Sequence, residues 1–223
     1  MMSFTKYFAI LLVAGGMYNL SFGATLTVDE RMDQIGDRVR ARLKPHFLRE
    51  RISYPPDKII LVTVKDEERL KVYAPGPGGD WNFVMQYQIA KLSGELGPKL
   101  RIGDEQVPEG VFKFTYMNRA SKYWLSLALN YPNEFDRRQA RRDKRKNLGG
   151  DIMIHGWWFS TGCVAVGNTA SEDMFVLAKD VGLNDMSIII TPTDFRNADS
   201  NKTKLPTKPA WVNDLYSNIE EEL

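Results

Sequence analysis

The sequence predicts a mainly β domain with flanking helices, within the α+β class. Between residues 58 and 129, short runs rich in β-branched and aromatic residues alternate with turn-forming segments, which is typical of a sheet built from hairpins. Helical spacing of apolar residues is confined to the two ends of the chain and to one segment after a Gly/Ser/Thr-rich turn. A chain of 223 residues is long enough for one domain with a complete hydrophobic core.

Residues 1–23 have the composition of a secretory signal peptide. Lys6 precedes an apolar run over residues 7–13, and Ser21 and Gly23 are small residues at the expected cleavage site. We therefore expect cleavage after Gly23 and export to the periplasm. The apolar run is too short for the about 20 residues of a membrane-spanning helix, so no stable membrane span is expected after cleavage.

Residues 24–56 are assigned to an N-terminal helical segment, with a helix over residues 27–50. Thr27 followed by Glu30 fits a capping box. We expect Pro45, and then the prolines at positions 55 and 56, to end this helix. Its opposite face is charged, which favours a helix docked on the domain over a partner-binding helix; the apolar stripe consists of Val28, Met32, Ile35, Val39 and Leu43.

The main domain is expected to span residues 57–196 and to begin with a hairpin. Strands over residues 58–64 and 69–74 are joined by the turn-forming segment Lys65-Asp66-Glu67-Glu68. The remaining elements follow the same alternation of runs and turns. They are strands at residues 81–90, 111–115, 122–129 and 187–191, a helix at about residues 171–180, and a tail over 197–223 with a polar loop followed by an amphipathic helix from Trp211.

The stretch of residues 152–166, IMIHGWWFSTGCVAV, concentrates the reactive side chains. It contains Cys163, the only cysteine, and His155, one of only two histidines. His155 ends an apolar run expected to be a buried strand, and Cys163 follows Gly162 in a predicted turn. An imidazole that takes the thiol proton creates a thiolate nucleophile and can return the proton to a leaving amine. Spacing alone favours the competing interpretation, a buried apolar cysteine and a core histidine.

Two separated motifs resemble a known family. His155-Gly156, three residues, and then Ser160-Thr161-Gly162-Cys163 is similar to the active-site signature of the L,D-transpeptidases with a YkuD-type catalytic domain. Upstream, residues 94–110 contain GELGPK, R-x-GD and PEG, which resemble the segment before that signature in the YafK-like branch. The resemblance covers roughly residues 57–195. It implies a YkuD-like β-sandwich or barrel that acts on bacterial cell walls.

The same resemblance implies a role for each residue of the signature. Cys163 corresponds to the nucleophile and His155 to the base, and the carbonyl of Gly156 orients the imidazole. The N–H groups of Gly162 and Cys163 correspond to an oxyanion hole, and Ser160 shapes the turn.

The chain departs from the family pattern at two places. Many members carry a histidine where this chain has Thr161, although YafK-like members also lack it. Many members also carry an arginine two or three residues after the cysteine, where this chain has Ala165 and Val166. The second departure changes how a substrate carboxylate is held.

Candidate substrate-binding residues lie near both motifs. Lys99, Arg101 and Asp104 either reach the cleft or form a structural turn beneath it, and the sequence favours neither interpretation. Core packing is the usual role of aromatic residues. However, Trp157, Trp158 and Phe159 are consecutive on a turn and cannot all point inward, so at least one is expected to line the cleft.

The basic run over residues 137–146 supplies two further candidates, Arg141 and Arg142. Seven of its ten residues are Arg or Lys, and Asp143 is its only acid. A solvated face is the usual interpretation of such a run. A lid that attracts the carboxylates of peptidoglycan stem peptides is the alternative.

These observations predict an exported cysteine enzyme that acts on peptidoglycan stem peptides through a thioester acyl-enzyme. An amine acceptor would give L,D-transpeptidation. Water would give L,D-carboxypeptidase, endopeptidase or amidase activity, the last releasing wall-linked lipoprotein as a further partner. A non-catalytic wall-binding module is a third alternative. No cofactor or metal site is expected from two isolated histidines and one cysteine, and a formal net charge of +2 does not indicate a nucleic-acid partner.

Overall fold

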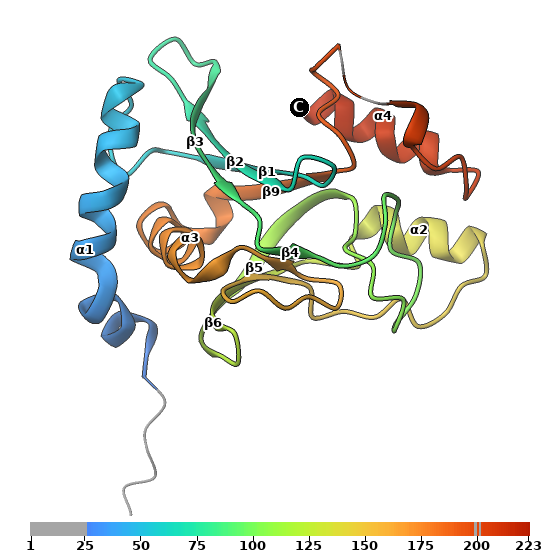
Figure 1. Cartoon of the computed structure of the whole chain (residues 1–223), viewed down its shortest axis with the longest axis horizontal. Helices are drawn as coiled ribbons and strands as arrows, with labels where there is room; N and C mark the ends of the chain where they lie inside the picture. The colour runs from blue at the N-terminus through green and yellow to red at the C-terminus, as the bar shows by residue number, and fades with distance from the viewer. Residues whose placement is uncertain (1–25, 199, 201) are drawn as a thin grey trace, which may run out of the picture.

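One bent sheet forms the centre of the molecule. The computed structural model describes residues 26–198, 200 and 202–223, and within them nine strands run in the order β3-β2-β1-β9-β5-β6-β7-β8-β4 (Figure 1). The strands are β1 (Ile59–Val64), β2 (Arg69–Pro75), β3 (Trp81–Gln88), β4 (Lys91–Leu92), β5 (Gly110–Ser121), β6 (Trp124–Leu129), β7 (Met153–His155), β8 (Val164–Ala165) and β9 (Met186–Thr191). The helices are α1 (Val28–Arg49), α2 (Glu134–Arg142), α3 (Gly167–Val181) and α4 (Val212–Glu222), with 3-10 turns at Leu183–Asp185 and Lys202–Lys204.

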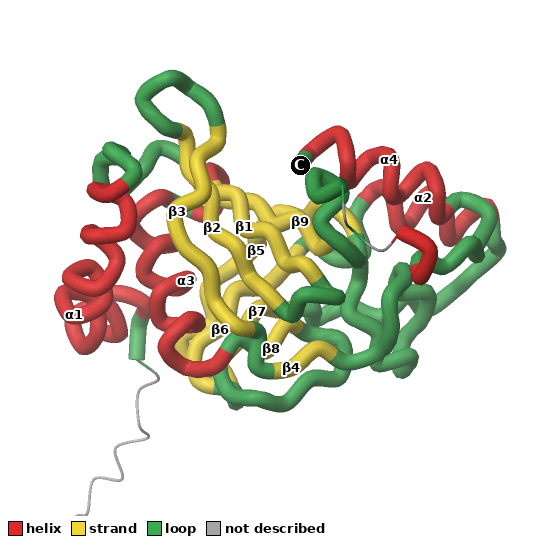
Figure 2. The backbone as a smooth tube through the Cα atoms, turned by 45° about the horizontal axis from the view of Figure 1, so that its top comes forward, coloured by secondary structure: helices red, strands yellow, loops and turns green. Residues whose placement is uncertain are grey.

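The long strand β5 joins the two halves of the sheet. Its first residues, from Gly110 to Lys113, pair with β9, whereas the remainder pairs with β6 and shifts register between Phe114 and Tyr116. Such irregularities bend a strand and increase its twist. As a result, β7, β8 and β4 lie at the far edge of the molecule from the β2–β3 hairpin (Figure 2).

Two hydrophobic clusters cover opposite faces of the sheet. Phe47 of α1 and Phe175 of α3 are fully buried against one face, where they share a cluster with Leu61. Ile219 of α4 packs on the other face with Val62. Adjacent residues of β1 therefore point into different clusters, which explains why this strand is apolar at every position except Thr63.

Helix α1 closely matches the predicted range of residues 27–50, but Pro45 does not act as expected. Thr27 and Glu30 form the capping box. The expectation that Pro45 ends the helix is wrong, because the helix continues to Arg49 with Pro45 inside it. The proline breaks one backbone hydrogen bond. Leu43 and Phe47, both fully buried, hold the turn on either side of it against the domain.

Most of the other predicted elements are present. The hairpin over residues 58–74, the helix that follows the Cys163 turn and the C-terminal helix all form. The predicted α+β class is confirmed. Helices and strands contribute about equally, because the basic run forms most of an unpredicted helix, α2, capped by Asn133. The short strands β4 and β8 were also not predicted.

The predicted signal peptide over residues 1–23 lies outside the described residues. Within the described part of the chain, none of the helices is long and apolar enough to cross a membrane.

Candidate active site

Strands β7 and β8 bring His155 and Cys163 close together. The two strands are parallel, and His155 pairs with Ala165, two residues after Cys163. Cys163 directly precedes β8, at the end of the turn that enters this strand. A strand spacing of about 4.8 Å and a two-residue offset of about 6.6 Å place the two Cα atoms roughly 8 Å apart, which allows the side chains to meet.

The imidazole of His155 is buried and oriented. Its Nδ1 donates a hydrogen bond to the carbonyl of Gly156 at 2.6 Å, which leaves Nε2 of the neutral ring as the proton acceptor. The ring stacks on Tyr123 with centroids 4.7 Å apart. Burial lowers the pKa of His155, and the Gly156 carbonyl only partly opposes this shift. At neutral pH the side chain is therefore an uncharged base.

The thiol of Cys163 is half-buried and protonated at rest. Burial raises its pKa, and so does the negative charge of Asp151, while the Met153 backbone N–H and the Lys99 charge lower it. In the resting structure Sγ contacts the carbonyl of Asp151 at 3.6 Å. A nucleophilic role for this thiol would therefore require a base, since the thiol does not start as a thiolate.

A chain of hydroxyl groups holds the turn before Cys163. Ser160 Oγ donates to the Cys163 carbonyl at 2.7 Å. Because Ser160 has only one hydroxyl proton, Ser93 Oγ donates to Ser160 Oγ at 2.8 Å. Ser93 Oγ in turn accepts the N–H of Gly162 at 2.6 Å. The Gly162 N–H is thus occupied at rest and would have to leave Ser93 to stabilise an oxyanion.

Sequence reasoning did not identify Ser93. Its only signal is its position directly before the glycine at 94 that opens the upstream motif. Its partners Ser160 and Gly162 lie more than 60 positions away, so their contact depends on the pairing of β4 with β8.

Three exposed aromatic side chains follow His155. Trp157, Trp158 and Phe159 are 43%, 71% and 52% exposed, so core packing does not apply to any of them. The rings of Trp157 and Trp158 stack with centroids 5.4 Å apart, and Tyr123 contacts both Trp157 and Phe159. We call Tyr123, Trp157, Trp158 and Phe159 the aromatic cluster.

The backbone at Trp157 is strained. Its φ is +61°, a conformation that costs a residue other than glycine about 1 kcal/mol or more. Asn168 Oδ1 accepts the Trp157 N–H, and Gly167 donates its N–H to the Trp157 carbonyl. A Cβ atom at Gly156 would lie 2.7 Å from that Asn168 oxygen, so glycine is required there.

The upstream loop over residues 94–110 is held by its own charges. Lys99 is 6% exposed and pairs with Asp104, which also accepts the N–H groups of Leu100 and Arg101. Burial tends to raise the pKa of Asp104, but these hydrogen bonds hold it below its ordinary value. Lys99 and Asp104 therefore fit the structural-turn alternative, whereas the side chain of Arg101 is exposed.

A cleft of about 520 Å³ lies beside this loop. We call it the cationic cleft; its lining is Pro98, Leu100, Arg101, Asp104, Gln106, Arg145 and Lys146. The predicted candidates Arg141 and Arg142 lie outside this lining, on the exposed face of α2. Arg141 is near Glu134, and Arg142 donates to Gln139.

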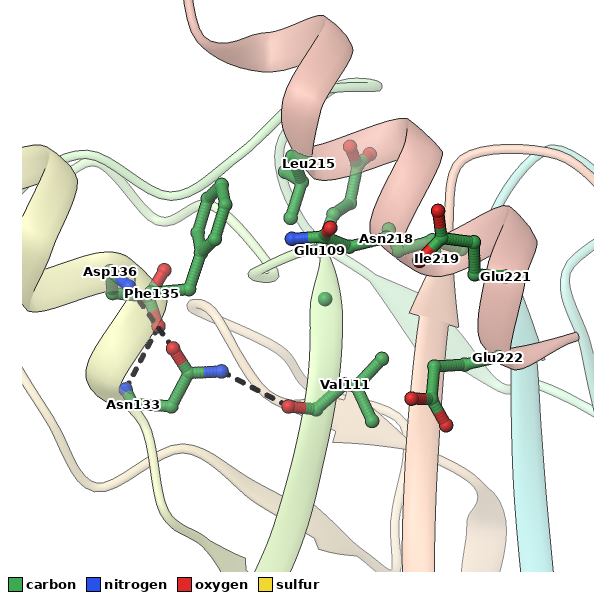
Figure 3. A pocket seen from close by; sticks show the side chains of 11 residues that line it. Glu109, Val111, Asn133, Phe135, Asp136, Leu215, Asn218, Ile219, Glu221 and Glu222 are labelled. Atoms are coloured by element: carbon green, nitrogen blue, oxygen red, sulfur yellow. Dashed lines mark hydrogen bonds between the residues drawn. The ribbon is translucent and has the colours of Figure 1, made fainter.

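A second pocket, of about 260 Å³, lies between α2, α4 and the start of β5 (Figure 3). Four carboxylates line it, but the two inner ones are already partnered. Glu109 accepts from Tyr216, and Asp136 accepts the backbone N–H of Asn133. Burial raises the pKa of Asp136 to about 6. This pocket shares no lining residue with the cationic cleft.

Sequence comparison identifies the family. The profile of the L,D-transpeptidase catalytic domain, YkuD, matches residues 58–190. The chain belongs to this L,D-transpeptidase family. The predicted YkuD-like fold is thereby confirmed.

Two curated relatives are similar to this L,D-transpeptidase domain. The chain is 31% identical over 142 residues to "Putative L,D-transpeptidase YafK" of Escherichia coli K12, covering 61% of this chain and 54% of that protein. The protein of the same name from Escherichia coli O157:H7 gives the same values. The chain thus spans about half the length of the curated relatives it matches.

Solved structures show more distant likeness. The helical cell shape determining protein Pgp2 of Campylobacter jejuni is 22% identical, with a TM-score of 0.49 over 77% of this chain and 57% of that chain. Bd1075 of Bdellovibrio bacteriovorus is 24% identical, with a TM-score of 0.45 over 64% of this chain and 51% of that chain.

The positions two and three residues after Cys163 carry no charge in this L,D-transpeptidase domain. Ala165 is 0% exposed and Val166 is 5% exposed, and both pack in the interior. These two buried positions therefore supply no positive charge to the site.

Proposed function

We propose that this chain is an exported cysteine enzyme that transfers an acyl group of a peptidoglycan stem peptide through a thioester on Cys163. The proposal is supported most by one observation, the parallel pairing of β7 and β8, which brings His155 next to the turn that carries Cys163. Family membership provides the reaction class. The printed name of the curated relative, an L,D-transpeptidase, agrees with a cell-wall substrate.

The first half of the reaction forms the acyl-enzyme. Sγ of Cys163 attacks the carbonyl carbon of the scissile amide while Nε2 of His155 accepts the thiol proton. The N–H groups of the Cys163 turn stabilise the oxyanion. The tetrahedral intermediate then collapses, the carbon–nitrogen bond breaks, and the amine leaves with the proton from His155. The product is a thioester between the peptide and Cys163.

The second half regenerates the thiol. An acceptor amine or a water molecule loses a proton to His155 and attacks the thioester carbonyl. The carbon–sulfur bond breaks, and the proton returns to Sγ. An amine acceptor forms a new cross-link. Water releases the peptide, and the same step on a lipoprotein-linked stem would release the lipoprotein.

Export to the periplasm is part of the proposal. Peptidoglycan lies outside the cytoplasmic membrane, and the leader-like composition of residues 1–23 supports export. Mass spectrometry of the protein recovered from the periplasm tests this point. We expect the first residue to be Ala24, and an intact Met1 would contradict the proposed cleavage.

The decisive experiment is digestion of purified muropeptides and of lipoprotein-linked sacculi, followed by mass spectrometry. Cross-linked products would identify a transpeptidase. Loss of a stem residue or release of lipoprotein would identify a hydrolase. Absence of both, from wild-type protein with a reactive thiol, would favour a wall-binding module.

A further inference from the structure

The cationic cleft contains two kinds of positive charge. Lys99 beneath it and Arg145 in its lining already have partners. Lys99 pairs with Asp104, and Arg145 donates to Asp143 Oδ2 and to the Leu100 carbonyl, both at 2.9 Å. The Lys99–Asp104 and Arg145–Asp143 pairs each lie within one segment, and the Arg145 bond to the Leu100 carbonyl joins the two sides of the cleft.

Arg101 and Lys146 are different. Both are exposed and line the cleft, and within the described residues neither side chain has a hydrogen-bond or ion-pair partner. The single carboxylate of the lining, Asp104, is neutralised by Lys99. The cleft therefore presents two uncompensated positive charges from two loops that are distant in sequence.

This cleft adjoins the nucleophile. Gln106, part of its lining, has its backbone oxygen 3.4 Å from where a Cβ atom of Gly162 would lie, directly before Cys163. The loop that carries Lys146 continues to Asp151, whose carbonyl contacts the Cys163 thiol. The charge of Lys99, directly beneath the cleft, lowers the pKa of that thiol even though burial raises it overall.

Residues that follow the family match at 58–190 contact the loops on both sides of the cationic cleft. Tyr216 of α4 donates to Glu109, which also accepts the Lys65 ammonium and the Gly97 N–H of the upstream loop. On the other side, Trp211 Nε1 donates to Asp143 at 2.7 Å, next to Arg145. Helix α4 thus supports both loops.

We propose that Arg101 and Lys146 bind a carboxylate of the peptide substrate. The positions two and three residues after Cys163, Ala165 and Val166, are buried and uncharged, so the two basic side chains supply the positive charge beside the turn instead. The guanidinium of Arg101 can bind a carboxylate through two hydrogen bonds, while Lys146 adds a point charge. This assignment rests on the proposed function, since it names the group of the stem peptide that the site selects.

Calorimetric titration tests the assignment without turnover. The full-length Cys163→Ala protein is titrated with a meso-diaminopimelate stem tetrapeptide carrying free carboxylates, and with the same peptide amidated. We expect the acid to bind about tenfold more tightly, which corresponds to one charge-assisted contact of about 1.4 kcal/mol. The variant carrying Arg101→Gln and Lys146→Gln should bind the two peptides equally.

A matched control removes the same charge elsewhere. Lys44→Gln with Arg51→Gln changes two exposed side chains in and after α1, at the other end of the molecule (Figure 1), and should keep the tenfold preference. Equal binding of acid and amide by the Cys163→Ala protein, or a preference that survives in the Arg101/Lys146 variant, would overturn the assignment. If the wild-type protein still turned over muropeptides, the proposed function would stand. Lack of both binding and turnover would overturn the two together.

Discussion

The cationic cleft and the aromatic cluster lie near Cys163 and His155 respectively, and they are built by different means. Directional bonds hold the cleft, from the Lys99–Asp104 pair to the Arg145 contact with the Leu100 carbonyl. The aromatic cluster has ring contacts and a strained backbone at Trp157 instead. Most charged residues near the cleft therefore stabilise the loops, whereas most of the aromatic cluster faces solvent. From residue type alone, we would expect the charged residues to face solvent and the aromatic residues to pack in the interior.

The largest effect should come from replacing Cys163, which lies near the cationic cleft. Cys163→Ala should lower kcat by at least about 10⁴-fold, because no other side chain can form the thioester. The melting temperature should change little, since a small half-buried thiol is lost. A thiol-reactive probe should label the native wild-type protein once. Residual turnover, or failure to label, would favour the buried apolar interpretation of Cys163.

The next largest effect should be the loss of activity at low pH. The imidazole must be neutral to accept the thiol proton. Because burial lowers the pKa of His155, activity should be lost only below the ordinary imidazole pKa of about 6.5. In that range kcat/KM should fall about tenfold per pH unit. The raised pKa of Cys163 predicts no second rise in activity as pH passes from 7 to 8. An acid limb centred above 6.5 would contradict a buried neutral base at His155. A loss of activity on the alkaline side, as an imidazolium gives up its proton, would instead indicate a preformed thiolate–imidazolium pair. A pH–rate profile distinguishes the two.

Ser93→Ala tests the hydroxyl groups that hold the turn before Cys163. The substitution removes the acceptor of the Gly162 N–H and the partner of Ser160. We expect kcat to fall about 10- to 100-fold with KM nearly unchanged, because the turn that aims the nucleophile loses its support. Ser217→Ala, on the exposed face of α4, is the matched control. An increase in kcat would show that Ser93 competes for the oxyanion donor.

Trp158→Ala tests the aromatic cluster. Because this side chain is 71% exposed, its removal should change the free energy of unfolding by only about 0.5 kcal/mol. If its ring contacts the substrate, KM should rise about three- to tenfold at nearly constant kcat. Steady-state kinetics on muropeptides measure both. An unchanged KM would separate the exposed rings from substrate binding.

The smallest effect should come from α2. Arg141→Gln with Arg142→Gln removes two charges outside the cationic cleft, so only long-range attraction remains to be lost. We expect about a twofold rise in KM at low salt that disappears as salt screens charges beyond about 10 Å at 0.1 M. If the variant and the wild type show the same salt dependence of KM, the basic run over residues 137–146 is a solvated face.

The sequence alone determined the features whose signals are local. The capping box of Thr27 and Glu30, the hairpin turn after β1, and the His-Gly and Gly-Cys signature each depend on residues close together in the chain. Helix α2 had such a signal as well, since Asn133 and Asp136 form a capping box, but its charged composition suggested a solvated run instead.

Only the tertiary structure decided which polar groups are available. The sequence gives no reason to distinguish four basic residues, Lys99, Arg101, Arg145 and Lys146. In the part of the chain that the structure describes, Lys99 and Arg145 are bonded within or between the loops of the cleft, whereas the side chains of Arg101 and Lys146 have no partner. Ser93 gains its importance only when β4 pairs with β8 and brings it to Ser160. The physical reason is that a hydrogen bond or ion pair needs atoms within about 3 to 4 Å, and the folded chain alone determines those distances.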